Sequence, residues 1–199
     1  MFAYIKGSLE EKNKNNVIVE NNGIGYIIFM PENSIKNLPE IGKEVKIHTY
    51  YYVREDNISL YGFNNLEELR MFELLLSVNG IGAKSAIVMI SEMSPSKFAL
   101  DVISGDVSSL VKIPGIGKKT AQRVILELKD KLKTESAIIQ ADTIEQNKLK
   151  IKTNDTIDEA VAALQVLGYQ QKEIEKALTK IQLENTTVED IIKQALKVL

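Results

Sequence analysis

The sequence of 199 residues contains no cysteine and no tryptophan, one histidine and four prolines. The absence of cysteine excludes disulfide frameworks, thiolate-bound zinc, iron–sulfur clusters and thiol nucleophiles. The single histidine, His48, excludes a site with several histidine ligands, and its place in an alternating run predicts an ordinary strand residue. No apolar run approaches the roughly 18 residues of a membrane helix, and residues 1–12 lack the apolar core of a signal peptide. We therefore expect a soluble cytoplasmic protein that has no membrane partner.

An excess of one charge is also lacking, because 25 basic residues are balanced by 27 acidic ones, giving a net charge of −2. Residues 1–63 carry 7 basic and 8 acidic residues, residues 64–133 carry 10 and 8, and residues 134–199 carry 8 and 11. A binding site for a polyanion must therefore be local. The middle segment, with a net charge of +2, is where we expect it.

Residues 1–63 show the pattern of a small β domain. Apolar and β-branched runs at 17–19, 26–29, 45–53 and 58–61 are separated by Asn, Gly and Pro residues. About five short strands in about 60 residues predict a small closed barrel, since closure removes unpaired sheet edges. An OB-type barrel is the favoured interpretation, and the periodicity leaves an SH3-like barrel open.

Three further segments complete a multidomain α+β organisation. Residues 64–133 have helical spacing interrupted by Gly, Ser-Pro and Gly-Asp, which predicts an all-α domain of short helices. Residues 134–154 are polar and lack sustained periodicity, so we expect a mobile linker. Residues 155–199 predict a three-helix bundle, in which Gly168 ends the first helix and Thr187 caps the third.

The middle segment contains an internal repeat. Residues 78–86 (VNGIGAKSA) match residues 113–121 (IPGIGKKTA) at a constant offset of 35 residues. Two glycines allow a tight turn and the close approach of a ligand. The helix that follows offers free N–H groups and the positive end of its dipole to a phosphate. We expect the isoleucine between the glycines to point inward and to anchor each turn.

A single Gly-x-Gly would indicate no more than a turn between helices, but matching Lys and Ser/Thr residues in both copies favour phosphate binding. A Walker loop requires a glycine directly before its Lys-Ser/Thr pair, after a strand, and here Lys118 stands at that position after a helix. Both copies also lack the third glycine that a Rossmann fingerprint requires. We therefore expect two sites for the backbone phosphates of a duplex, which position DNA without reading its sequence.

The paired Gly-Ile-Gly segments resemble helix-hairpin-helix DNA-binding motifs. Together with the N-terminal barrel, VRED at 53–56, LYGFN at 60–64 and EAVAALxxLGY at 159–169, they resemble the RuvA family of Holliday-junction-binding proteins. The resemblance covers essentially the whole chain and is weakest in the linker. It implies a non-catalytic scaffold with no metal or cofactor, which acts in recombination, DNA repair and the SOS response.

The resemblance also implies roles for individual residues. A homotetramer would hold four-way junction DNA on one concave face, and an octamer on DNA is left open. Glu55 and Asp56 correspond to the family's acidic pin, which would repel phosphates and help to separate strands at the crossover. The implied DNA-binding residues are Asn79, Gly80, Ile81, Gly82, Lys84, Ser85, Pro114, Gly115, Ile116, Gly117, Lys118, Lys119, Thr120 and Arg123.

The C-terminal domain would dock a RuvB-type hexameric ATPase through residues 155–199. The matching docking positions are Leu164, Leu167 and Tyr169. The two leucines have the spacing of bundle core, whereas Tyr169, just past the helix end, is the candidate that we expect to be exposed. A RuvC-type resolvase is a further partner that the resemblance leaves open.

The residues alone leave other interpretations open. Arg54–Asn57 would be an ordinary polar hairpin turn. Glu55 and Asp56 could hold Mg²⁺ in a structure-specific nuclease, although no further acidic cluster lies nearby in sequence. The three tyrosines at 50–52 could stack on bases, as in a general single-strand-binding or repair adaptor. Strand alternation places Tyr51 on the opposite face from its two neighbours.

Overall fold

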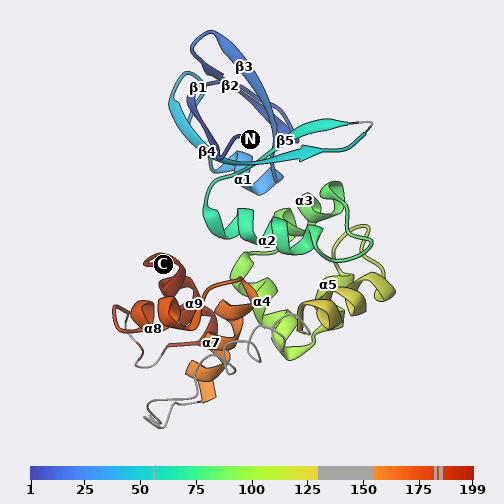
Figure 1. The fold of residues 1–199 in the computed structure, drawn as a ribbon, viewed down its shortest axis with the longest axis vertical. Coiled ribbons are helices and arrows are strands. Elements are labelled where there is room, and N and C mark those ends of the chain that lie inside the picture. The colour runs from blue at the N-terminus through green and yellow to red at the C-terminus, as the bar shows by residue number, and fades with distance from the viewer. Residues whose placement is uncertain (56, 130–154, 182, 184–185) are drawn as a thin grey trace. The chain divides into compact units, whose positions relative to one another are not determined.

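The computed structural model of the chain is drawn in Figure 1. It describes all residues except 56, 130–154, 182 and 184–185. Packing divides the chain into two compact units, residues 1–73 with 82–94 and residues 74–81 with 95–199. The expected boundaries of the four segments remain predictions, and the expected linker lies outside the described residues.

The N-terminal strands form a closed barrel. They are β1 (Tyr4–Lys12), β2 (Asn16–Asn21), β3 (Ile24–Phe29), β4 (Glu44–Val53) and β5 (Ile58–Phe63). The barrel order is β1-β2-β3-β5-β4, and only the β3–β5 pairing is parallel. Helix α1 (Glu32–Lys36) is inserted between β3 and β4. This five-stranded arrangement confirms the predicted OB-type barrel over the SH3-like alternative.

Alternating side chains fill the barrel. Along β4, Val45, Ile47 and Thr49 are buried, while the residues between them are partly or fully exposed, as the alternating sequence predicts. Tyr51 continues this inward row and packs against the barrel core. The β4–β5 ladder extends as far as the pair Val53 and Ile58, and this part of the hairpin projects from the barrel (Figure 1).

Two further helices belong to the same unit as the barrel: α2 (Leu66–Leu76) as far as residue 73, and the whole of α3 (Ala83–Glu92). Asn65 caps α2, since its Oδ1 accepts a hydrogen bond from the Glu68 N–H at 2.8 Å. Helix α3 is tied to α1, because Ser91 Oγ accepts from the Glu32 N–H at 3.0 Å.

Glu68 is a half-buried carboxylate at the meeting point of α1, β5 and α2. Its Oε2 accepts hydrogen bonds from Ser34 Oγ at 2.9 Å and from the Asn64 N–H at 3.2 Å. The Asn64 side chain in turn donates to the Ser34 carbonyl at 2.8 Å. Burial raises the pKa of Glu68, and the two hydrogen bonds oppose part of that rise.

The remaining described helices lie in the second unit. They are α4 (Pro95–Ser104), α5 (Val107–Val111), a helix with described residues 118–129, α7 (Asp155–Val166), α8 (Gln171–Leu178) and α9 (Val188–Leu196). The three predicted C-terminal helices are confirmed. Gly168 has φ +83° after α7, and the Thr187 hydroxyl accepts from the Asp190 N–H at 3.2 Å, so both predicted helix boundaries are present.

Candidate nucleic-acid interface

The two Gly-Ile-Gly segments adopt the same backbone turn. Ile81 N donates to the Val78 carbonyl at 3.1 Å, and Ile116 N donates to the Ile113 carbonyl at 3.1 Å. The first glycine of each copy has a positive φ, +89° at Gly80 and +81° at Gly115. A four-residue turn with a positive φ at its third position is of type II, which explains the glycine there.

The middle isoleucine of each turn points inward, as predicted. Ile81 is 6% exposed and Ile116 is 4% exposed. Each turn is therefore anchored by one buried isoleucine side chain, and its backbone lies at the surface. The exposed members of the two turns are Asn79, Gly80, Gly82, Lys84, Pro114, Gly115, Gly117, Lys118 and Lys119, while Ser85 and Thr120 are partly buried.

Neither backbone strain nor side-chain packing requires the second glycine of each repeat copy. Gly82 has φ −96° and ψ 168°, a conformation open to any residue, and Gly117 also lies outside the positive-φ region. A Cβ at either position would meet no heavy atom within 4 Å. Each glycine directly precedes a helix, whose first N–H groups have no partner within that helix. This bare backbone is suited to close contact with an anion.

Arg123 joins the two copies. It lies on the helix that follows the second turn, yet its Nη1 donates to the carbonyl of Asn79 in the first turn at 3.2 Å. From the same helix, Glu127 Oε2 accepts from the Asn79 N–H at 3.1 Å. Glu127 is not among the predicted site residues, because no local sequence pattern signals a contact across 48 residues.

The acidic turn lies at the end of the projecting β4–β5 hairpin. Arg54 N donates to the Asn57 carbonyl at 2.8 Å and closes the turn, and Glu55 is exposed. Asp56 lies outside the described residues. The Arg54 guanidinium lies over the Tyr52 ring, 5.1 Å from its centroid, and Nε donates to the Tyr52 hydroxyl at 3.0 Å.

The tyrosines at 50–52 divide between two faces of β4, as strand alternation predicts. Tyr51 packs toward the barrel core and against Phe2, with ring centroids 5.7 Å apart. Tyr50 contacts Phe72 at 5.4 Å, and Tyr52 contacts Tyr61 at 5.7 Å. Each of the three rings therefore contacts another aromatic side chain of the same unit, and Tyr51 lies on the opposite face from Tyr50 and Tyr52.

His48 lies on the same strand and is partly exposed. Its partial burial lowers its pKa, the positive charge of Lys46 adds to this effect, and Glu67 opposes it. In the described part of the chain, no cluster of three or more His, Asp or Glu residues could hold a metal ion. No described helix is long and apolar enough to span a bilayer.

The expectation that Tyr169 is exposed is wrong. Tyr169 is 7% exposed, and Leu164 and Leu167 are 0% and 1% exposed. The reason is the turn that ends α7: Tyr169 N donates to the Leu164 carbonyl at 3.2 Å, and Gly168 N donates to the Gln165 carbonyl at 2.9 Å. This pair of bonds is the Schellman motif, which folds the residue after the glycine back onto the helix.

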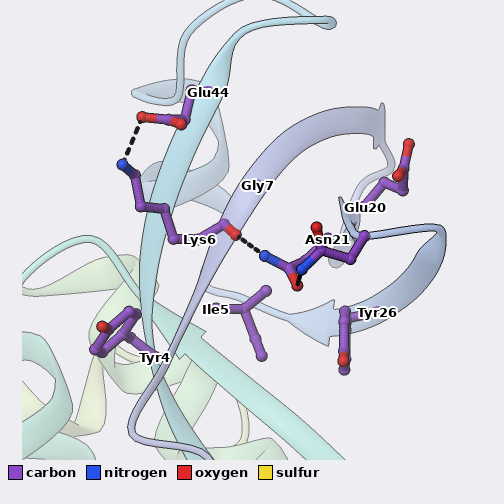
Figure 2. A pocket seen from close by; sticks show the side chains of 9 residues that line it. Tyr4, Ile5, Lys6, Gly7, Glu20, Asn21, Tyr26 and Glu44 are labelled. Carbon is purple, nitrogen blue, oxygen red and sulfur yellow. Dashed lines mark hydrogen bonds and ion pairs between the residues drawn. The ribbon is translucent and has the colours of Figure 1, made fainter.

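The barrel surface carries a shallow hollow of about 500 Å³, shown in Figure 2. Its polar groups bind one another: Lys6 Nζ lies 2.9 Å from Glu44 Oε1, and Asn21 Nδ2 donates to the Lys6 carbonyl at 2.7 Å. Glu20 accepts from the Gly23 N–H at 2.9 Å. The first two contacts connect neighbouring strands and the third lies in the β2–β3 turn, so we interpret the hollow as part of the barrel wall and not as a ligand site.

The fold and the duplicated turns define a class of protein, a closed β-barrel joined to a tandem of helix-hairpin-helix motifs. Family models match the chain in the same order. The matches are the RuvA N terminal domain at residues 1–62, the SAM-like Helix-hairpin-helix tandem at 72–130 and the RuvA C-terminal domain at 155–199.

Curated relatives match over the full length. Proteins named "Holliday junction branch migration complex subunit RuvA" are 53% identical over 197 residues in Acetivibrio thermocellus and 49% identical over 199 residues in Ruminiclostridium cellulolyticum. These alignments cover 99% and 100% of this chain and 98% and 100% of the relatives. A relative of the same name in Clostridium perfringens is 43% identical over 205 residues, covering 100% of this chain and 99% of its own. The chain belongs to the RuvA family.

Proposed function

We propose that the chain is a non-catalytic scaffold that binds four-way DNA junctions by their shape and backbone phosphates. It would help to separate strands at the crossover and recruit a RuvB-type hexameric ATPase for branch migration. The observation that carries this proposal is the duplicated turn. Both copies expose a glycine that the fold does not require, directly before a helix that carries Lys84 or Lys119 in its first turn.

The acidic hairpin supplies the second element of the proposal. Glu55 is exposed at the tip of a projecting ribbon, and its charge would repel phosphates that approach it. A carboxylate among phosphates favours the separation of strands over their close pairing. Four copies of the tip in a homotetramer would place this repulsion at the centre of a junction. An octamer on DNA and a RuvC-type resolvase as a further partner belong to the same proposal.

We assign docking of the hexameric ATPase to residues 155–199. Because Leu164, Leu167 and Tyr169 are buried, their contribution would be to hold the shape of the helices. The surface that meets the ATPase would then be formed by exposed residues of the same three helices. The names of the full-length relatives, which describe a subunit of a branch migration complex, support a partner of this kind.

The proposal predicts strong selectivity for junctions. In a competition gel shift at about 150 mM salt, where binding through a few phosphate contacts is weak, a synthetic four-way junction should outcompete linear duplex and single strand. The double substitution Lys84→Glu and Lys119→Glu should abolish junction binding, since it places two negative charges at the turns. The melting temperature should change little, because both lysines are exposed.

The matched control is Lys14→Glu with Lys43→Glu, which makes the same charge change at two exposed barrel lysines. Equal affinity for all three DNA forms would contradict junction recognition and support the single-strand-binding or repair adaptor. Unchanged junction affinity in the Lys84/Lys119 variant would remove the turns from the interface. Cleavage of a labelled junction by the protein with Mg²⁺ would support the nuclease instead.

A further inference from the structure

The two turns are alike in backbone but differ at their second residue. Pro114 occupies this position in the second turn and Asn79 in the first, at the repeat offset of 35 residues. Proline is favoured at the second position of a type II turn because its ring sets φ in advance. It also has no N–H group that needs a partner. The second turn is therefore set by its own covalent structure, whereas the first turn is not.

The first turn is held from outside by two side chains of the helix at 118–129. Glu127 Oε2 accepts from the Asn79 N–H at 3.1 Å, and Arg123 Nη1 donates to the Asn79 carbonyl at 3.2 Å. Arg123 Nε also lies 3.9 Å from Glu127 Oε1, so the two side chains brace each other. Together they fix the residue of the first turn that corresponds to the proline of the second.

This clamp is not a feature shared by both repeats. Glu127 corresponds to Glu92 in the first copy, but Arg123 corresponds to Val88, which cannot donate a hydrogen bond. Glu92 lies at the exposed end of α3. The acid–base pair is therefore present only on the helix of the second copy, and it contacts the proline-free turn of the first copy.

We propose that Glu127 is a positioning residue for DNA binding, which acts by clamping the Asn79 peptide and by orienting Arg123. The inference rests on the proposed function, because the first turn is taken as a phosphate site. The Arg123 side chain is 53% exposed, and a guanidinium has five N–H donors. It can hold the turn with one nitrogen and keep donors for a phosphate beside the turn.

Charge and positioning predict opposite changes in DNA affinity when the Glu127 side chain is removed. Removing an acidic side chain near a phosphate site should tighten DNA binding if charge alone decides. If Glu127 positions the turn, its truncation to alanine should weaken binding despite the gain in positive charge. The isosteric Gln variant separates the two effects, since its carbonyl can still accept from the Asn79 N–H while the charge is gone.

The experiment measures the affinity of the full-length protein for a four-way junction. Glu127→Ala should bind at least about tenfold more weakly than the wild type, the effect of losing a hydrogen bond to a charged group. Glu127→Gln should stay within about threefold of the wild type. Glu92→Ala, which removes the same charge from the equivalent position of the other repeat, should bind at least as well as the wild type.

A proline in the first turn provides the rescue. In an Asn79→Pro background the turn is set by the ring and the N–H is gone, so Glu127→Ala should cost less than half of its effect in the wild-type background. The slope of log affinity against log salt gives a second readout. Glu127→Ala should flatten this slope by roughly one phosphate contact, which a loss of stability alone would not do.

Equal tightening by Glu127→Ala and Glu127→Gln would overturn the proposal in favour of simple charge repulsion. An undiminished effect of Glu127→Ala in the Asn79→Pro background would overturn the clamp. Failure of the proposed function is recognised separately, since the wild-type protein would then show no preference for the junction over linear duplex.

Discussion

Four glycines in the two turns fall into two pairs that differ in their reason for being glycine. Gly80 and Gly115 have positive φ values, so a side chain there strains the backbone. Gly82 and Gly117 have neither a positive φ nor a neighbour that a Cβ would touch. The second pair therefore points to something that the folded chain alone does not contain, and DNA is the ligand that we propose.

This difference predicts that stability and DNA binding can be separated by alanine substitution. Gly82→Ala and Gly117→Ala should change the free energy of unfolding by less than about 1 kcal/mol. They should weaken junction binding about tenfold each, because a methyl group would hold a phosphate away from the N–H groups. Denaturant unfolding and gel shifts on the same samples give both quantities.

The comparison variants are Gly80→Ala and Gly115→Ala, which should lower the free energy of unfolding by about 1 kcal/mol or more. Full junction affinity in Gly82→Ala and Gly117→Ala would show that no ligand approaches these positions closely. The second-glycine sites would then be ordinary helix starts.

At the scale of elements, Glu68 connects α1, β5 and α2 through a carboxylate whose pKa is raised mainly by burial. In the folded protein it holds its proton to a higher pH than the ordinary value of 4.5 allows in the unfolded chain. Between these two pKa values the folded state binds more protons, so stability decreases as the pH rises. Below pH 4.5 both states are largely protonated, and this loss is absent.

Glu68→Gln should remove that pH dependence, because the amide is neutral throughout and its carbonyl still accepts from Ser34 and Asn64. The melting temperature of the wild type should fall relative to that of the variant as the pH rises above 4.5. Thermal melts between pH 4 and 7 measure this difference. A difference that is constant across the range would place Glu68 in contact with solvent.

Much of the secondary structure follows from short-range patterns in the sequence. The strand at 45–53, the Thr187 cap and the inward isoleucines each depend on spacings of a few residues, and all are confirmed. The five-residue helix α1 was not predicted, since it is too short to show helical periodicity. Its place is set by contacts with Ser91 and Ile90, far along the chain.

Two parts of the candidate site could not be found in this way. The Glu127 contact joins residues that are 48 positions apart, and a lone glutamate on an amphipathic helix looks like an ordinary surface residue. The position of Tyr169 follows from the backbone bonds after Gly168, which turn the chain back onto α7. The glycine was recognised as a helix end, but the burial of the next residue was not.

For the whole molecule, the net charge of −2 means that DNA binding cannot come from a general attraction. On our proposal it is the sum of local contacts at the turns, and each neutralised phosphate contributes roughly −0.9 to the slope of log affinity against log salt. A homotetramer on a junction would engage more turns than the same protein on one linear duplex. The salt dependence should therefore be steeper for the junction.

Affinities measured at several salt concentrations for both DNA forms test this prediction, with the oligomeric mass measured in parallel by light scattering. A junction slope equal to the duplex slope would mean that the same few turns are used in both complexes. The preference for the junction would then have to arise from its shape or from the acidic hairpin.

The projecting β4–β5 ribbon carries its acidic tip outside the barrel interior. Val53 and Ile58, the last pair of its ladder, are both exposed, and Glu55 adds nothing to the apolar core. The ribbon is instead braced by the ring contact between Tyr52 and Tyr61. Folding therefore places almost no demand on which side chain stands at position 55. Natural selection or a protein engineer can rewrite the tip without rebuilding the barrel, and any constraint on its sequence comes from the molecule that it meets.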